Sequence, residues 1–240
     1  MAGPRPSLRA WARSSCPDPR PYHRPMYLAK LTGALLLGVT RLLTGAQARW
    51  WGCPPKAEQR IYFANHQSHI DLVMIWAALP GELRSITRPI AARDYWANSP
   101  FKRWITTEVF NAIYVERGGT PAPAEDGAAP PDPMAPLQPL IEALKSGDSI
   151  IIFPEGTRGH TGVPQKFKSG LYTLAQMFPE VVLVPAWIDN VQRVMPKGEV
   201  VPVPILCSVT FGAPIRIEPG EERRAFLDRA REAVIALRDV

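Results

Sequence analysis

Cysteine is scarce in this sequence. Only three occur among 240 residues, Cys16, Cys53 and Cys207, and they stand far apart. Their number and spacing match no disulfide framework and no pattern of metal ligands. The sequence therefore indicates a protein of a reducing compartment.

Long hydrophobic runs are also absent. The most apolar segment, residues 26–51, is interrupted by Lys30 and Arg41, whereas a membrane-spanning helix needs about 20 predominantly apolar residues. We therefore predict a helix over 26–51 that lies in the membrane interface, with the Trp50-Trp51 pair at headgroup level. A helix that packs against the protein's own core is the alternative. No secretory signal peptide is expected, because Arg41 follows the apolar stretch where a small-residue cleavage site would stand.

Signatures of nucleic-acid binding are missing as well. The net charge is +6, but no basic helix interleaved with aromatic residues and no zinc-finger spacing occurs, so no nucleic-acid partner is expected. Much of the excess charge lies in residues 1–25, which are rich in arginine and proline. We predict that they form a disordered basic tail suited to an anionic membrane surface; a merely solvated tail is the alternative. The proline-rich residues 118–136 are predicted to form a second disordered stretch, an insertion in the folded domain.

Apolar, β-branched segments alternate with helical patterns over residues 52–240. Strands are expected at residues 61–64, 85–92 (broken by Pro89), 112–115, 149–153, 181–184 and 205–211, and helices at 70–79, 99–105, 137–145, 167–177 and 221–238. Strands that are apolar throughout are typical of a sheet covered by helices on both faces, with much parallel pairing. We therefore predict an α/β fold: a single domain with a mixed, largely parallel sheet flanked by helices, preceded by the N-terminal interface helix.

A polar turn with the sequence NHQSHID, residues 65–71, joins the first predicted strand to the first predicted helix. His66 and Asp71 are candidates for a general base and its orienting carboxylate, if His66 lies in the turn and Asp71 in the first turn of the helix. Two alternatives stay open. Ser68 and Asp71 match a helix-capping pair, and His66, His69 and Asp71 match a set of metal ligands.

The sequence FPEGTR, residues 153–158, follows the fourth predicted strand and forms a second candidate loop. Gly156 permits a tight turn, which would present Glu155 and Arg158 at the same sheet edge as His66. The guanidinium fork of arginine suits a phosphate group, and backbone amides around Gly156 suit a developing oxyanion. A structural salt bridge between Glu155 and Arg158 is the alternative.

Four segments together resemble the PlsC-like glycerolipid acyltransferase family, the lysophosphatidate acyltransferases. Residues 65–71 resemble its first motif, 111–117 (NAIYVER) its second, 153–158 its third and 184–188 (VPAWI) its fourth, in matching order and spacing. The sequence departs from the family pattern at Asn111, where glycine is frequent, at Glu116, where aspartate is frequent, and at Gly159, where serine is common. These departures concern the identity of the acceptor and leave the reaction class unchanged.

The resemblance implies transfer of a fatty acyl group from acyl-CoA or acyl carrier protein to the hydroxyl of lysophosphatidate, giving phosphatidate without a cofactor or metal. His66 would take the proton of the acceptor hydroxyl, Asp71 would hold the imidazole, and the amides of the Glu155–Gly156 turn would face the oxyanion. The implied acceptor-binding residues are Arg117, Glu155, Gly156, Thr157 and Arg158.

The implied place of action is the cytoplasmic face of a membrane, to which the protein would be bound as a monotopic or peripheral protein. Two other functions stay open: acyl transfer to a different lysolipid, and lipid binding without catalysis on the same fold.

Overall fold

The computed structural model describes residues 26–45, 47–68, 70–116, 134–159, 162–189 and 206–240. The predicted tail at 1–25 and most of the predicted insertion at 118–136 lie outside these residues, so both predictions stay untested.

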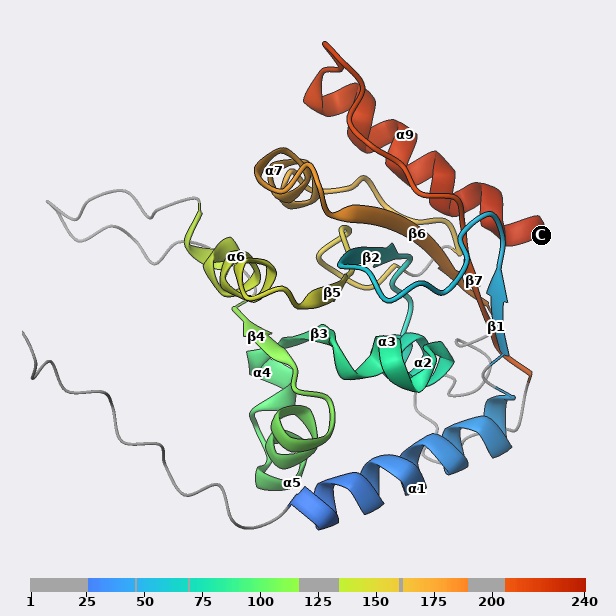
Figure 1. Cartoon of the computed structure of the whole chain (residues 1–240), viewed down its shortest axis with the longest axis vertical. Helices are drawn as coiled ribbons and strands as arrows, with labels where there is room; N and C mark the ends of the chain where they lie inside the picture. Colours follow the sequence, from blue (N-terminus) through green and yellow to red (C-terminus); the bar gives the residue numbers. More distant parts are fainter. Residues whose placement is uncertain (1–25, 46, 69, 117–133, 160–161, 190–205) are drawn as a thin grey trace, which may run out of the picture.

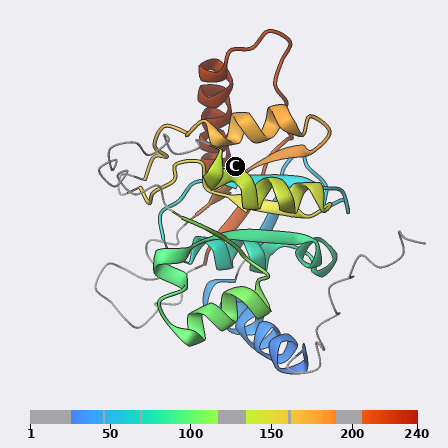
Figure 2. The ribbon, with the colours of Figure 1, turned by 90° about the vertical axis from the view of Figure 1, so that its left-hand side faces the viewer.

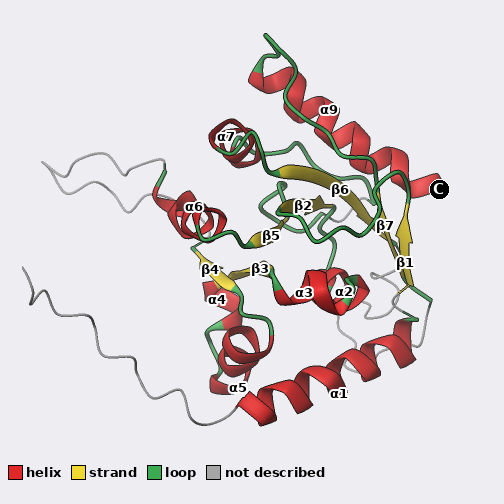
Figure 3. Ribbon diagram, viewed as in Figure 1, coloured by secondary structure: helices red, strands yellow, loops and turns green. Residues whose placement is uncertain are grey.

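The described residues form a seven-stranded sheet with the strand order β1-β7-β6-β2-β5-β3-β4 (Figure 3). Its strands are β1 Gln47–Trp50, β2 Arg60–Ala64, β3 Thr87–Ala92, β4 Ile113–Val115, β5 Ser149–Ile152, β6 Val182–Ile188 and β7 Ser208–Phe211. The pair β6–β7 is antiparallel, and every other neighbouring pair of this sheet is parallel. The predicted mixed, largely parallel sheet is confirmed.

Helices cover both faces of this sheet (Figures 1 and 2). They are α1 Met26–Thr44, α2 Asp71–Ala78, α3 Gly81–Ser85, α4 Arg93–Trp96, α5 Pro100–Trp104, α6 Gln138–Lys145, α7 Gly170–Met177 and α9 Arg223–Ile235. A π-helix, Ile105–Val109, continues α5, and short 3-10 helices, Ala135–Leu137 and Ala236–Asp239, precede α6 and follow α9.

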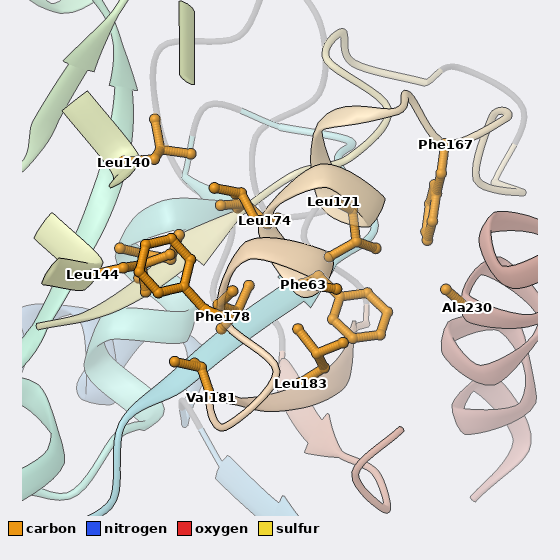
Figure 4. Packing of buried hydrophobic residues seen from close by; sticks show 14 of the residues in the cluster. Phe63, Leu140, Leu144, Phe167, Leu171, Leu174, Phe178, Val181, Leu183 and Ala230 are labelled. Atoms are coloured by element: carbon orange, nitrogen blue, oxygen red, sulfur yellow. The ribbon is translucent and has the colours of Figure 1, made fainter. Parts of the chain in front are cut away.

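The central strands send alternate side chains into two separate cores. In β2, Tyr62 and Ala64 contribute to the core on the α2 side, whereas Ile61 and Phe63 contribute to the core beneath α6, α7 and α9 (Figure 4). All five residues of β2 are buried. This explains why the strand reads as an uninterrupted apolar run after Arg60: successive side chains point to opposite faces, and both faces are covered.

The predicted helix over 26–51 is wrong at its C-terminal end. Helix α1 ends at Thr44, and Gly45 follows with a positive φ of 69°, a conformation that glycine adopts readily at helix ends. Residues 47–50 then form β1, parallel to β7. Trp50 stacks on Phe211 with ring centroids 4.2 Å apart, whereas Trp51 is exposed. The two tryptophans, the last residue of β1 and the residue after it, therefore lie in different environments.

Several other predicted limits differ from the structure, and two of these differences have a clear physical reason. Pro89 does not break its strand but pairs with Ile151 of β5 inside β3. The neighbouring strand β4 begins to pair with β3 only at Ile90, so Pro89 lies where β3 has a partner strand on one side. The helix predicted over 167–177 begins only at Gly170, because the residues before it still belong to the loop that follows β5.

Helix α1 packs against the domain with one face and presents apolar side chains to solvent with the other. On the packed face, a Cβ on Gly33 would lie 3.3 Å from Val109 and 3.9 Å from Trp76, so the absence of a side chain permits close approach. The exposed apolar side chains are Tyr27, Leu28, Leu31, Leu35, Val39 and Leu42. Within the described ranges, no helix combines the length and apolarity that crossing a membrane would require.

Candidate active site

The two candidate loops meet at the carboxyl edge of the sheet. The loop after β2 carries His66, and the loop after β5 carries residues 153–158. Strands β2 and β5 are parallel neighbours, with Phe63 opposite Ile152, so both loops leave the sheet side by side (Figure 1). This is the edge at which open parallel sheets commonly bind ligands.

His66 and Asp71 form the predicted pair. The Nδ1 atom of His66 lies 2.9 Å from Oδ2 of Asp71, and the Asp71 side chain is almost fully buried. Since a carboxylate only accepts, the bond places the imidazole proton on Nδ1 and leaves Nε2 able to accept a proton. The geometry is that of a general base with an orienting carboxylate.

The same Asp71 oxygen also shapes the turn. It accepts the backbone N–H groups of Gln67 at 2.6 Å and Ser68 at 2.8 Å. The predicted N-cap role of Ser68 is wrong, because Ile70 occupies the N-cap position of α2 and makes no side-chain cap bond. The hydroxyl of Ser68 only accepts the N–H of Ile70, at a long 3.5 Å. Only the reciprocal half of the capping pattern is present, from Asp71 back to the amide of Ser68. Asp71 therefore both organises the turn and orients the histidine. His69, the third residue of the metal alternative, lies outside the described residues.

The backbone and ring of His66 are fixed by the loop after β5. Its N–H donates to Oε1 of Glu155 at 2.7 Å, and its carbonyl accepts the N–H of Gly159 at 2.8 Å. Its ring stacks on Phe153 at a centroid distance of 4.3 Å. With Nδ1 bonded to Asp71, His66 is held at its amide, carbonyl, ring face and one ring nitrogen.

Glu155 is buried, with 3% of its surface exposed. Its second oxygen, Oε2, accepts the N–H of Gln165 at 2.7 Å. Burial raises the pKa of Glu155, against the opposing effect of the two backbone hydrogen bonds. Both Glu155 and Arg158 belong to the described residues, and no ion pair joins them, so the salt-bridge alternative is wrong.

Gly156 forms the tight turn that its sequence predicts. Its φ is +70°, and its N–H donates to the carbonyl of Phe153 at 3.0 Å. That amide is therefore engaged within the turn, in contrast to the role predicted for it at the oxyanion. The side chain of Lys168 lies over Gly156, with Nζ only 2.6 Å from the position that a Cβ would take. The absence of a side chain at Gly156 thus makes room for the lysine stem.

A cavity of about 400 Å³ opens beside His66. Lys168 and Glu116 join His66 as its charged or titratable lining. Its apolar lining comes from β3, β4, β5, α6 and α7 and includes Ile90, Val115, Leu140, Ile152, Leu171 and Leu174. The cavity therefore combines the imidazole of His66 with a largely apolar lining, a combination suited to a ligand with a long alkyl chain.

The structure describes only some of the remaining predicted site residues. Arg117 lies outside the described residues. Thr157 is exposed and Arg158 is partly buried, both on the loop after β5. Glu116 is exposed, and its Oε1 lies 3.9 Å from Nε of Arg93.

The sequence did not reveal the role of Asn65. Its buried side chain donates through Nδ2 to the carbonyl of Ile188 at 3.0 Å and accepts the N–H of Ile188 at 2.8 Å. An asparagine at the very end of a buried strand was the available signal, because a polar side chain there needs partners. The stacking of Phe153 on His66 left no signal in sequence, since the contact joins two loops far apart in the chain.

Comparison with known proteins identifies the family. The family model described as "Acyltransferase" matches residues 54–189, which include both candidate loops. The chain belongs to the acyltransferase family. The family predicted from the four motifs is thereby confirmed.

The acyltransferase is similar to several curated proteins. It is 28% identical over 188 residues to the human "1-acyl-sn-glycerol-3-phosphate acyltransferase alpha", covering 76% of this chain and 60% of that protein. It is 26% identical over 165 residues to a "1-acyl-sn-glycerol-3-phosphate acyltransferase" of Cocos nucifera, covering 68% of this chain and 48% of that protein. The chain thus spans about 60% of the length of the first of these relatives.

The fold is also similar to a solved structure. The crystal structure of PlsC from Thermotoga maritima, a 1-acyl-sn-glycerophosphate acyltransferase, superposes with a TM-score of 0.60 at 21% sequence identity. The match covers 89% of this chain and 78% of that one. At this identity the likeness concerns the fold, and it agrees with the predicted single α/β domain.

Proposed function

We propose that this acyltransferase transfers a fatty acyl group from acyl-CoA or acyl carrier protein to the hydroxyl of lysophosphatidate, giving phosphatidate. The observation that carries the proposal is the bond between His66 and Asp71 beside an apolar cavity. The names of the curated relatives support the choice of lysophosphatidate as acceptor.

The reaction needs one base and no covalent acyl-enzyme. Nε2 of His66 takes the proton of the acceptor hydroxyl while its oxygen attacks the thioester carbonyl, forming a tetrahedral intermediate. The carbon–sulfur bond then breaks, and the thiolate leaving group receives the proton from the imidazolium. Asp71 keeps the imidazole in the correct tautomer and stabilises the imidazolium between these two steps. The products are the acylated glycerolipid and a free thiol.

Cations near the dyad are suited to the acceptor's phosphate. Lys168 lines the cavity together with His66, and Arg158 lies on the loop that holds His66. We assign phosphate binding to these two residues and to Arg117, and place Gly156 and Thr157 beside them in the acceptor site. The apolar part of the cavity would accommodate an alkyl chain of donor or acceptor.

The exposed face of α1 supports a peripheral position on a membrane. Its apolar side chains recur at intervals of three and four residues, so they share one side of the helix. An amphipathic helix of this kind binds in the interfacial region of a bilayer, where its apolar face leaves water. Such a position would bring the enzyme to a lipid acceptor, and we place it on the cytoplasmic face.

The test is an acceptor-by-donor panel with purified protein and lipid vesicles. We expect labelled acyl transfer from acyl-CoA or acyl carrier protein to 1-acylglycerol 3-phosphate, and a rate lower by about 10²- to 10⁴-fold for His66→Ala. The matched control is His69→Ala, from the same turn and outside the dyad. Transfer that His66→Ala leaves unchanged would overturn the mechanism. Turnover of a different lysolipid would move the proposal to that acceptor, and binding without turnover would indicate a lipid-binding module.

A further inference from the structure

We propose that Glu155 is a positioning residue that sets the direction of the catalytic imidazole, and not a residue that binds the acceptor. This inference rests on the proposed function, because it assigns how the base of that reaction is held. It replaces the acceptor-binding role that the family resemblance implies for Glu155.

Both oxygens of the Glu155 carboxylate accept hydrogen bonds from backbone N–H groups. Oε1 accepts the N–H of His66 and Oε2 accepts the N–H of Gln165, each at 2.7 Å. These distances are short for N–H···O bonds and are typical of bonds to a charged acceptor. Only 3% of Glu155 is exposed, and it is not among the residues that line the cavity. An acceptor molecule in the cavity is therefore poorly placed to reach either oxygen.

The bond to His66 acts together with a second one on the same residue. Gly159, four residues after Glu155, donates its N–H to the carbonyl of His66 at 2.8 Å. The loop after β5 therefore forms hydrogen bonds with both backbone groups of His66, the N–H before its Cα and the carbonyl after it. The ring is joined to that Cα through Cβ, and Nδ1 is already bonded to Asp71. The two backbone bonds therefore leave the direction of Nε2 with little freedom. A misplacement of reacting groups by about 1 Å can reduce the rate by about 10²-fold.

The arrangement requires a carboxylate. Two backbone donors from different parts of the chain converge on this side chain, so it must offer two acceptor oxygens. Glutamine offers one oxygen and one NH₂ group, and the NH₂ group would face a backbone N–H without a bond. Glu155→Gln has nearly the same size and therefore tests the acceptors rather than the packing.

The experiment compares kinetics and amide resonances of Glu155→Gln with those of the wild type. We expect kcat to fall by about 10²-fold, with the KM for lysophosphatidate changed by less than about twofold. Arg158→Ala, assigned to phosphate binding, should instead raise that KM. Glu142→Gln, an exposed glutamate on α6, is the matched control with unchanged kinetics. A raised KM for Glu155→Gln with unchanged kcat would overturn the inference.

A second readout does not depend on turnover. In ¹⁵N-labelled protein, the His66 amide proton should resonate downfield because of its short bond to a carboxylate, and it should move upfield in Glu155→Gln. If the wild type transfers no acyl group yet this resonance shifts, the proposed function fails while the contact itself stands. An unmoved resonance in a folded variant would refute the positioning role.

Gly159→Ala tests the same contact if Glu155→Gln does not fold. A Cβ at Gly159 would lie 3.3 Å from Oε2 of Glu155 and 3.7 Å from the carbonyl oxygen of His66. It would therefore disturb the two hydrogen bonds to His66 sterically without removing an acceptor. We expect a smaller fall in kcat, with KM unchanged. Wild-type kcat in this variant would contradict the inference.

Discussion

The side chain of Asn65 offers the sharpest test of how the catalytic turn is anchored. It is almost fully buried and makes two hydrogen bonds with the backbone of Ile188, at the end of β6. Asn65→Ala would leave a buried N–H and a buried C=O of Ile188 without partners. Each such group costs about 1–3 kcal/mol, so we expect a loss of about 2–6 kcal/mol in the free energy of unfolding. This is a large part of the roughly 5–15 kcal/mol that stabilises a typical domain.

The loss should appear in urea denaturation followed by circular dichroism. Asn65 directly precedes His66, so a lower kcat for acyl transfer should accompany the lower stability. Gln59→Ala is the matched control, because the amide of Gln59 also donates twice, to the carbonyls of Leu144 and Asp148. Gln59 directly precedes β2 and lies at the opposite end of that strand, so its loss should lower stability without lowering kcat.

Asn65→Asp separates the two bonds of this side chain. It keeps an acceptor for the N–H of Ile188 but loses the donor to its carbonyl and adds a buried charge, so it too should be destabilised. The reasoning is refuted if Asn65→Ala loses less than about 1 kcal/mol, or if Gln59→Ala reduces kcat as strongly as Asn65→Ala does.

Three further predictions follow from single features. Gly156→Ala should lose about 1–2 kcal/mol of stability in urea because of its positive φ, and should raise the KM for lysophosphatidate because its Cβ displaces Lys168. Burial raises the pKa of Tyr62 to about 12, so the neutral phenol stabilises the folded state below about pH 10, and this stabilisation is lost as the pH rises towards 12. Between pH 8 and pH 11 the free energy of unfolding of the wild type should therefore fall by about 1.4 kcal/mol more than that of Tyr62→Phe. Replacing Leu31 and Leu35 by serine should weaken sedimentation with anionic vesicles by about tenfold or more, with the urea midpoint unchanged.

The sequence predicted the features that depend on local pattern. The local pattern predicts strand β2 from its apolar run, the helix after it and the polar turn between them. The pair His66–Asp71 follows from the requirement that one residue lie in the turn and the other in the helix. What could not be predicted are contacts between distant segments. The bonds between His66 and Glu155 and between Asn65 and Ile188 join segments 89 and 123 residues apart in the sequence, and no local periodicity indicates them.

Errors at element limits have the same origin. Residues 47–50 (QARW) follow directly on an apolar helical pattern, which predicts that the helix extends to them, but their pairing with β7 decides their conformation. Pro89 is an unfavourable strand residue on average, yet one neighbouring strand reaches β3 only after this position. In both places tertiary pairing overrides the local preference.

The pairing of β1 with β7 also governs the order in which the chain can complete its fold during synthesis. Gln47 pairs with Ser208, about 160 residues later, a delay of about 10–30 s at about 5–20 residues per second. Over this interval β1 lacks its partner strand, and once β6 Val182–Ile188 has been made its outer edge is also open to other chains until β7 follows. By then His66, Asp71 and Glu155 have all been made, so a nascent chain carries all three residues of the proposed site on an unfinished sheet. The last strand thus covers the open edge of β6 and joins β1 to the sheet, whereas the residues of the proposed site all come from earlier parts of the chain.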